Sequence, residues 1–180
     1  MDRANHYEAA FESYLQAGRH AYVAVDEARR SVLGDSPVKS LDFLVFGRAG
    51  AKLCVDVKGR RFPAGPQAKP RRVWECWASA EDVDGLERWS RLAGDGFRGL
   101  FVFAYLLGKD VELPDSTSGL HRFRGRRYLF RAIDADDYRE CMRVRSPRWK
   151  TVSLPLRDYR ALVRPFDDFV RVEEPESCPF

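Results

Sequence analysis

The feature that most constrains the fold is a pair of apolar segments joined by a short glycine-containing turn. LDFLVF occupies residues 41–46, KLCVDVK occupies residues 52–58, and GRAGA (47–51) connects them. Both segments are rich in aromatic and β-branched residues, which favour strands, and a connection of this length is typical of a hairpin. The sequence therefore predicts two antiparallel strands here.

The alternation of side chains limits the register of this hairpin. A turn centred on Ala49 gives one face that is entirely apolar, with the cross-strand pairs Phe43–Val55, Val45–Leu53 and Leu41–Val57. A slip of one residue would mix apolar and polar side chains on both faces, so the pattern excludes it, whereas a slip of two residues would keep both aspartates on one face but make them diagonal rather than opposite. The other face then holds the pairs Asp42–Asp56 and Leu44–Cys54, with Lys58 beside Asp56.

The polar face of the hairpin thus carries two aspartates that are predicted to face each other. Like charges directly across a sheet repel, and partial burial would keep one of them protonated unless a cation lay between them. Mg²⁺ suits such a place, because it takes one or two carboxylates together with water and phosphate oxygens. Lys58 could then hold or deprotonate an attacking water. The alternative is an ordinary ion pair between Asp56 and Lys58 on a half-exposed sheet.

A helix is predicted upstream of the hairpin. Asn5 or Asp2 can cap it, Gly18 ends it, and its apolar stripe consists of Tyr7, Phe11, Tyr14 and Leu15. Glu8 lies at the edge of this stripe, from where it could reach the aspartates as a second metal ligand, directly or through water. A short strand at 22–25 and a brief helix from Asp26 to Gly34 are expected to lie between this helix and the hairpin.

The segments downstream complete an α/β domain. A helix over 81–94 precedes GLFVFAYLL (99–107), which is apolar on both faces, as expected for a central strand covered on two sides. A strand at 127–133 and helices at 135–143 and 156–163 follow. The core order is α-β-β-β-α-β, which predicts a mixed central sheet with an additional C-terminal strand and helices. We expect one domain over residues 1–172 and a loose tail at 173–180.

These residues carry a resemblance to a known family. Glu8 on the first helix, Asp42 on one strand and Asp56-Val57-Lys58 on the next resemble the PD-(D/E)xK nuclease superfamily. The element order resembles its core, as in archaeal Holliday-junction resolvases and many restriction endonucleases, over about residues 5–107. Leu41 stands where the motif has proline, a departure that removes one letter of the motif but no ligand.

The resemblance implies a divalent-metal-dependent enzyme that hydrolyses phosphodiester bonds of DNA. Asp42, Asp56 and the main-chain carbonyl of Val57 would bind Mg²⁺, or Mn²⁺ in its place, and Glu8 would join them. Lys58 would act on the nucleophilic water. Nucleases of this family that cut both strands are often dimers, so a homodimer is one expected assembly.

Two basic segments fit a nucleic-acid partner. Residues 58–72 carry six basic side chains and no acidic one, and among them Arg60, Arg61, Arg71 and Arg72 are expected on an exposed loop (59–72) that contacts backbone phosphates. Residues 120–150 carry ten basic and four acidic side chains with aromatic residues between them. A solvated, arginine-rich surface is the alternative for this second segment.

Composition narrows the class of protein that the chain can be but does not decide its function. A net charge of +4 permits a polyanionic partner but does not require one. The first residues contain no apolar core of a signal peptide, and no apolar run reaches the roughly 20 residues of a membrane span. We therefore expect a cytoplasmic protein without a membrane segment. A non-catalytic nucleic-acid-binding or protein-interaction module on the same fold is the alternative function.

Overall fold

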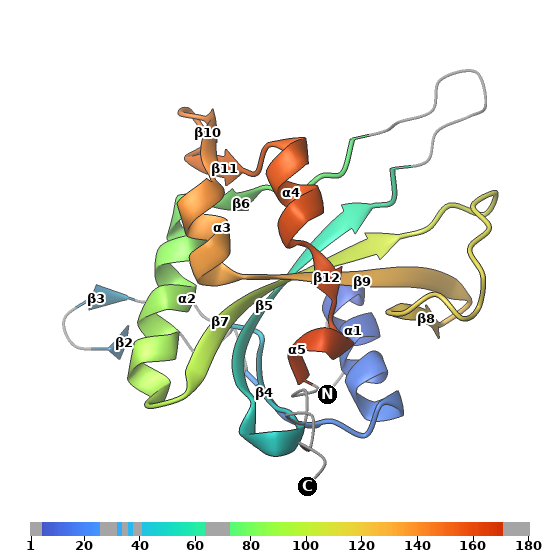
Figure 1. Ribbon diagram of the computed structural model, residues 1–180, viewed down its shortest axis with the longest axis horizontal. Helices are drawn as coiled ribbons and strands as arrows, with labels where there is room; N and C mark the ends of the chain where they lie inside the picture. Colours follow the sequence, from blue (N-terminus) through green and yellow to red (C-terminus); the bar gives the residue numbers. More distant parts are fainter. Residues whose placement is uncertain (1–4, 26–31, 34–35, 38–40, 64–72, 171–180) are drawn as a thin grey trace, which may run out of the picture.

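The computed structural model describes residues 5–25, 32–33, 36–37, 41–63 and 73–170 (Figure 1). Its centre is a seven-stranded sheet in the order β1-β4-β5-β7-β9-β12, with β8 paired to β9. These strands are β1 (Ala21–Ala24), β4 (Phe43–Phe46), β5 (Lys52–Arg61), β7 (Phe97–Leu106), β8 (Leu120–Phe123), β9 (Arg126–Asp134) and β12 (Arg164–Pro165). Only the pair β5–β7 of this sheet is parallel, so the sheet is mixed, as predicted.

The register predicted for the hairpin is confirmed over β4 and β5. Phe43 pairs with Val55 and Val45 pairs with Leu53, and the turn between the strands is a short 3₁₀ helix, Arg48–Gly50. The ladder ends at Phe43, however, and the expected pairing of Leu41 with Val57 is wrong.

The cause is a bend at Asp42. The Val57 N–H donates to Asp42 Oδ2 at 2.6 Å, so a side chain replaces the main chain as the partner of Val57. Beyond this bend Leu41 packs on the face of the sheet that carries Cys54, whereas Val57 packs on the opposite face.

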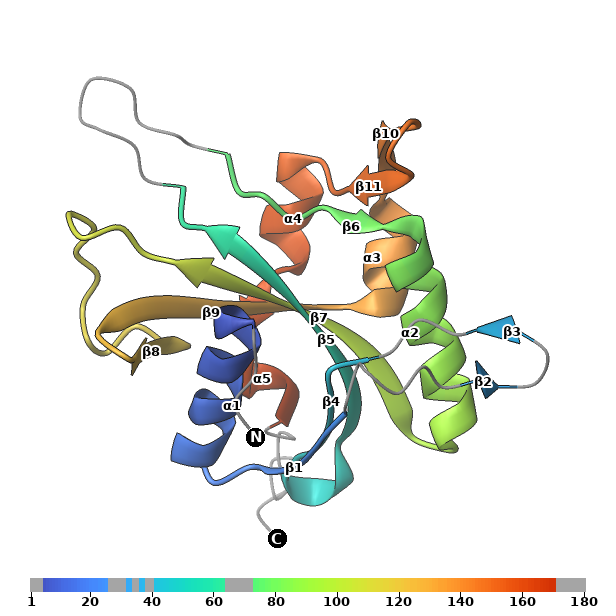
Figure 2. The ribbon, with the colours of Figure 1, turned by 180° about the vertical axis from the view of Figure 1, so that it is seen from behind.

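Helices cover both faces of the sheet (Figures 1 and 2). Helix α1 (His6–Ala17) and the short α5 (Asp167–Val170) pack on the face that carries Phe43 and Val55. Helices α2 (Ala80–Ala93), α3 (Ala135–Cys141) and α4 (Leu156–Leu162) pack on the other face. Strand β7 lies between the two layers, buried on both sides, as expected from its unbroken apolar run.

Local sequence explains where the two long helices begin and end. The Asn5 side chain accepts from Tyr7 N at the start of α1, and Gly18 caps the end of this helix. Of the two residues predicted as N-caps, Asn5 is therefore the one used. Helix α2 starts with a capping box, in which Ser79 Oγ accepts from Asp82 N and Asp82 accepts from Ser79 N. Gly94 ends this helix in a left-handed conformation that favours glycine.

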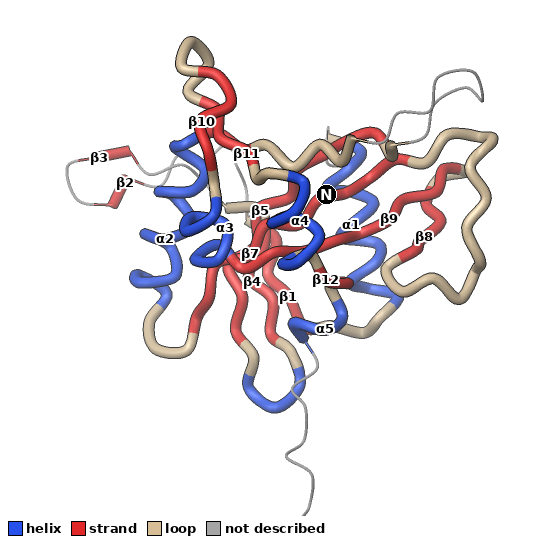
Figure 3. The backbone as a smooth tube through the Cα atoms, turned by 45° about the horizontal axis from the view of Figure 1, so that its top comes forward, coloured by secondary structure: helices blue, strands red, loops and turns tan. Residues whose placement is uncertain are grey.

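Several short strands were not predicted. A second sheet joins β10 (Arg143–Ser146), β11 (Thr151–Ser153) and β6 (Ala78–Ser79), and a two-stranded piece joins β2 (Val32–Leu33) and β3 (Ser36–Pro37). Figure 3 shows the β10–β11 hairpin projecting from the body of the molecule. The helix expected from Asp26 to Gly34 falls mostly outside the described residues, and β2 occupies its described part.

Other expectations concern segments that lie partly or wholly outside the described residues. The loop expected at 59–72 is wrong for its first three residues, which continue β5 in the parallel ladder with β7. The expected tail at 173–180 lies outside the described residues. Among the helices that the structure describes, none is long and apolar enough to span a membrane.

Candidate active site

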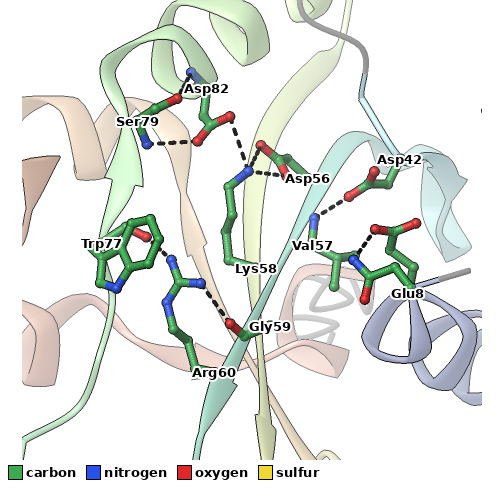
Figure 4. Close-up of polar contacts among 11 residues, drawn as sticks. Glu8, Asp42, Asp56, Val57, Lys58, Gly59, Arg60, Trp77, Ser79 and Asp82 are labelled. Carbon is green, nitrogen blue, oxygen red and sulfur yellow. Dashed lines mark hydrogen bonds and ion pairs between the residues drawn. The ribbon is translucent and has the colours of Figure 1, made fainter. Parts of the chain in front are cut away.

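Lys58 on β5 lies at the centre of the polar contacts predicted from the hairpin (Figure 4). Its Nζ is 2.7 Å from both carboxylate oxygens of Asp56 and 3.2 Å from Asp82 Oδ1. The side chain of Lys58 is only 15% exposed and that of Asp82 only 4%, so these contacts are shielded from water. The two residues expected to share one face of the strand are therefore joined, and a second carboxylate, that of Asp82, completes the group.

The sequence interpretation missed Asp82. This residue lies in the first turn of α2, where its Oδ2 accepts from Ser79 N at 2.7 Å while its Oδ1 faces Lys58. The capping box thus fixes the rotamer of the carboxylate that holds the ammonium group. The signal in the sequence was Ser79 followed three residues later by an acidic residue, a pattern that predicts a helix start but not a contact with β5.

The charge state of Lys58 follows from this environment. Burial alone would lower the pKa of its ammonium group. The carboxylates of Asp56 and Asp82 more than offset burial, and Asp42 adds to their effect, so the pKa of Lys58 is raised above its ordinary value. In this arrangement Lys58 is a fixed cation at neutral pH rather than a base.

Asp42 and Glu8 are both buried, and Figure 4 shows them on the same side of Val57. Asp42 is 3% exposed and binds Val57 N, so it lies beside the β5 main chain whose carbonyl was expected to be a ligand. Glu8 is 7% exposed on the first turn of α1 and accepts from the Asn5 side chain. Helix α1 reaches β5 directly, because the Tyr7 ring lies against Gly59.

The donor set fits a hard divalent ion in its chemistry. Glu8, Asp42, Asp56 and the Val57 carbonyl offer only oxygen atoms, the ligands that Mg²⁺ prefers. Within the described residues, however, no group of three or more His, Cys, Asp or Glu side chains is arranged to hold a metal ion. Figure 4 shows the reason: Asp56 is turned toward Lys58, whereas Asp42 is turned toward Val57 N.

The four arginines expected to contact phosphates do not form one group. Arg60 is buried: its guanidinium lies 3.8 Å from the centre of the Trp77 ring and donates to the carbonyls of Trp77 and Gly59. Its Nε is buried and has no hydrogen-bond partner among the described residues. Burial also lowers the pKa of Arg60. Arg60 is therefore part of the packing of β5 and not of an exposed phosphate-binding loop.

Of the remaining three, Arg61 is exposed at the end of β5, where a phosphate could reach it. Arg71 and Arg72 lie outside the described residues. Trp77 is half-buried, and two guanidinium groups, those of Arg60 and Arg145, lie over its ring.

Comparison with solved structures identifies the fold. The chain superimposes on Hjc, a Holliday junction resolvase from the archaeal hyperthermophile Archaeoglobus fulgidus, with a TM-score of 0.52 and 14% identity. The match covers 91% of this chain and 98% of that one, well beyond the residues in which the sequence resemblance was found. No family model matches the chain, and no curated protein matches it in sequence.

The chain therefore has the fold of a PD-(D/E)xK nuclease, of the kind found in archaeal Holliday junction resolvases. The expected likeness of the fold to archaeal Holliday junction resolvases and the mixed α/β architecture inferred from the order of elements are both confirmed. At 14% identity the likeness concerns the fold, and the chemistry has to be argued from the residues of this chain.

Proposed function

We propose that this protein is a divalent-metal-dependent nuclease that hydrolyses phosphodiester bonds of DNA. One observation carries the proposal. On β5, Lys58 is buried in contact with Asp56, and Asp42, directly before the neighbouring strand β4, lies beside Val57. A structural ion pair would need no second buried aspartate next to the adjacent strand, no glutamate buried on α1 and no nuclease-like fold around it.

Each residue has a distinct task in this proposal. Asp42, Asp56 and the Val57 carbonyl would hold Mg²⁺ or Mn²⁺, with Glu8 joining them directly or through water. The metal would lower the pKa of a bound water and neutralise charge on the scissile phosphate. Lys58, protonated, would donate to the attacking water or to a phosphate oxygen. Asp82 is the positioning residue, because it keeps the ammonium group in place when Asp56 serves as a ligand.

The DNA backbone would be held outside this centre. Arg61 at the end of β5, together with Arg71 and Arg72, would contact phosphates, which gives affinity without choice of sequence. Arg60 takes no part in these contacts, because its guanidinium is buried on Trp77.

A cleavage screen tests the proposal. Linear duplex, single-stranded and branched DNA are incubated with the purified protein in Mg²⁺, in Mn²⁺ and in EDTA. We expect cleavage that requires the metal and falls at least about 100-fold in Asp56→Asn and in Lys58→Met, as when one preorganised electrostatic group is removed from an active site. Arg88→Ala, an exposed charge change on α2, serves as the matched control. Full activity in either site variant would refute the assignment.

A non-catalytic DNA-binding module on the same fold is the second candidate. The closed contact between Lys58 and both oxygens of Asp56 favours it, because these groups satisfy each other without a metal. Such a module would bind DNA with a steep salt dependence and would cut no substrate in either metal. Absence of DNA binding at low salt would instead leave a protein-interaction domain.

A further inference from the structure

The β10–β11 hairpin carries an exposed tip, residues 143–150, that the proposed chemistry does not use; we call it the arm. Val144 is 70% exposed and Trp149 is 68% exposed, which is unusual for such large apolar side chains. The arm stands away from the two helical layers in Figures 1 and 3. Its turn is ordered by internal bonds, with Lys150 N donating to Pro147 O and Trp149 N to Ser146 Oγ.

The charge of the arm is entirely positive. Its eight residues contain four basic side chains and no acidic one, namely Arg143, Arg145, Arg148 and Lys150. All four are exposed, and none of them forms an ion pair with a described residue. The guanidinium of Arg148 lies 5.2 Å from the centre of the Trp149 ring, so a cation and an aromatic face are presented together.

The base of the arm is joined to the candidate active site. Thr151 pairs with Ser79, and Ala80 N donates to Lys150 O at 2.9 Å. Ser79 and Ala80 open helix α2, whose first turn places Asp82 on Lys58. The arm therefore projects from the segment that completes the Lys58 contacts.

An irregularity in the hairpin turns one arginine back toward this segment. The register between β10 and β11 shifts between Val144 and Ser146, which leaves Arg145 as the extra residue. Its guanidinium lies 5.3 Å from the centre of the Trp77 ring, on which Arg60 of β5 also packs. Basic groups thus continue from β5 to the tip of the arm.

We propose that the arm binds the DNA substrate, and that Trp149 stacks on a base that is unpaired at a branch or other discontinuity. This rests on the proposed function only in taking DNA as the ligand. The four cations match the phosphates on either side of such a base. The indole can stack only on a base whose face is accessible. In an intact duplex the neighbouring bases cover both faces of each base, so we expect the arm to favour DNA with a discontinuity.

Binding measured without metal tests the arm separately from cleavage. Two fluorescent probes are used in EDTA at fixed ionic strength, a blunt duplex and the same duplex with one unpaired branch. We expect the unmodified protein to bind the branched probe more tightly. Trp149→Ala should lose about five-fold or more in affinity for the branched probe, the lower end of what stacking of one base on an aromatic ring contributes. Trp149→Phe, which keeps a ring, should lose less.

The basic residues give a second, independent readout. Arg143→Ala and Arg148→Ala should weaken binding of both probes alike and lower the slope of log affinity against log salt by about one each. Leu92→Ala and Arg88→Ala are matched controls, because both residues are exposed on α2, away from the arm. Neither control should change the preference for the branched probe.

The outcomes separate the two proposals. Unchanged affinity and preference in Trp149→Ala would overturn the arm proposal even if the protein cleaves DNA, and so would binding of the arm to anionic vesicles or to a protein in place of DNA. Loss of branched-probe binding in Trp149→Ala, with no cleavage of any substrate, would support the arm and refute the nuclease function.

Discussion

Lys58 is a buried cation whose contribution to stability depends on pH. Its pKa in the folded chain is raised by Asp56 and Asp82, so folding is stabilised by protonation of this group. The contribution is complete below the pKa of the unfolded chain, near 10.5, and is lost as the pH rises through the higher folded value. We expect the free energy of unfolding to fall more steeply above this pH in the unmodified protein than in Lys58→Met. Urea denaturation at a series of alkaline pH values measures both slopes.

Tyrosines and cysteines also lose protons at alkaline pH. Because they are the same in both proteins, the difference between the two slopes reports on Lys58. Lys58→Met leaves two carboxylates buried without their ammonium partner, a change that can cost about 3–5 kcal/mol. Lys58→Met combined with Asp56→Asn, which removes both charges of the pair, is measured if the single variant does not fold. Parallel pH curves for the unmodified protein and the variant would contradict the prediction.

Single residues also show where sequence reasoning stops. Asp56 and Lys58 could be placed on one face because strand alternation is strictly periodic, whereas the bend at Asp42 interrupts that period and could not be foreseen. Glu8 could be placed at the edge of a stripe for the same kind of reason. Asp82 could not be found, because a capping box fixes only the local conformation of α2 and says nothing about which strand that helix packs on. Arg60 was misplaced because a run of basic residues gave no sign that the β5 ladder with β7 continues through it.

Gly59 is one of the points at which strand β5 and helix α1 are in contact. A Cβ added there would lie 2.2 Å from Cδ2 of the Tyr7 ring, closer than carbon atoms can approach. Gly59→Ala should therefore displace Tyr7, and with it the neighbouring Glu8, and lower the free energy of unfolding by about 1–3 kcal/mol, as for other overpacked sites. Chemical denaturation of the variant measures this loss.

Gly108→Ala is the matched control, because the nearest atom to an added Cβ there is 3.8 Å away. Shortening the opposing side chain tests the cause. In a double-mutant cycle, Tyr7→Ala and Gly59→Ala together should cost less than the sum of the two single losses. Additive losses would mean that the two elements are not in the contact described.

At the scale of elements, long periodic segments were predictable and short strands were not. The strands β4, β5 and β7 and the helices α1 and α2 each contain enough turns or alternations to show their period. Strands β6, β11 and β12 contain only two or three residues, and β10 is exposed along most of its length. Their pairing is decided by neighbours far away in the sequence, so no local pattern marks them.

Phe166 packs the C-terminal part of the chain against helix α1. It follows β12, is fully buried, and its ring centre is 5.0 Å from that of Phe11 on α1. Phe166→Ala should cost about 3–5 kcal/mol, the usual range for removal of a buried phenyl ring. Trp149→Ala, at an exposed position, should change stability by less than about 0.5 kcal/mol. Thermal and urea unfolding of both variants test the contrast.

A small loss in Phe166→Ala, similar to that of Trp149→Ala, would mean that the C-terminal elements add little to the core. The similarity to Hjc over 91% of the chain agrees with the larger loss, since it includes most of the residues after 107.

The parallel pairing of β5 with β7 has a consequence for the order of folding. The β4–β5 hairpin closes over a five-residue turn, whereas β5 and β7 are separated along the chain by the whole of β6 and α2. Contacts between distant parts of a chain form late, because a large loop must close first. We therefore expect the hairpin to form while Lys58 is still hydrated. Lys58 would be desolvated only when α2 packs on the sheet and brings Asp82 into contact with it. The site would therefore be among the last parts of the molecule to reach the native structure.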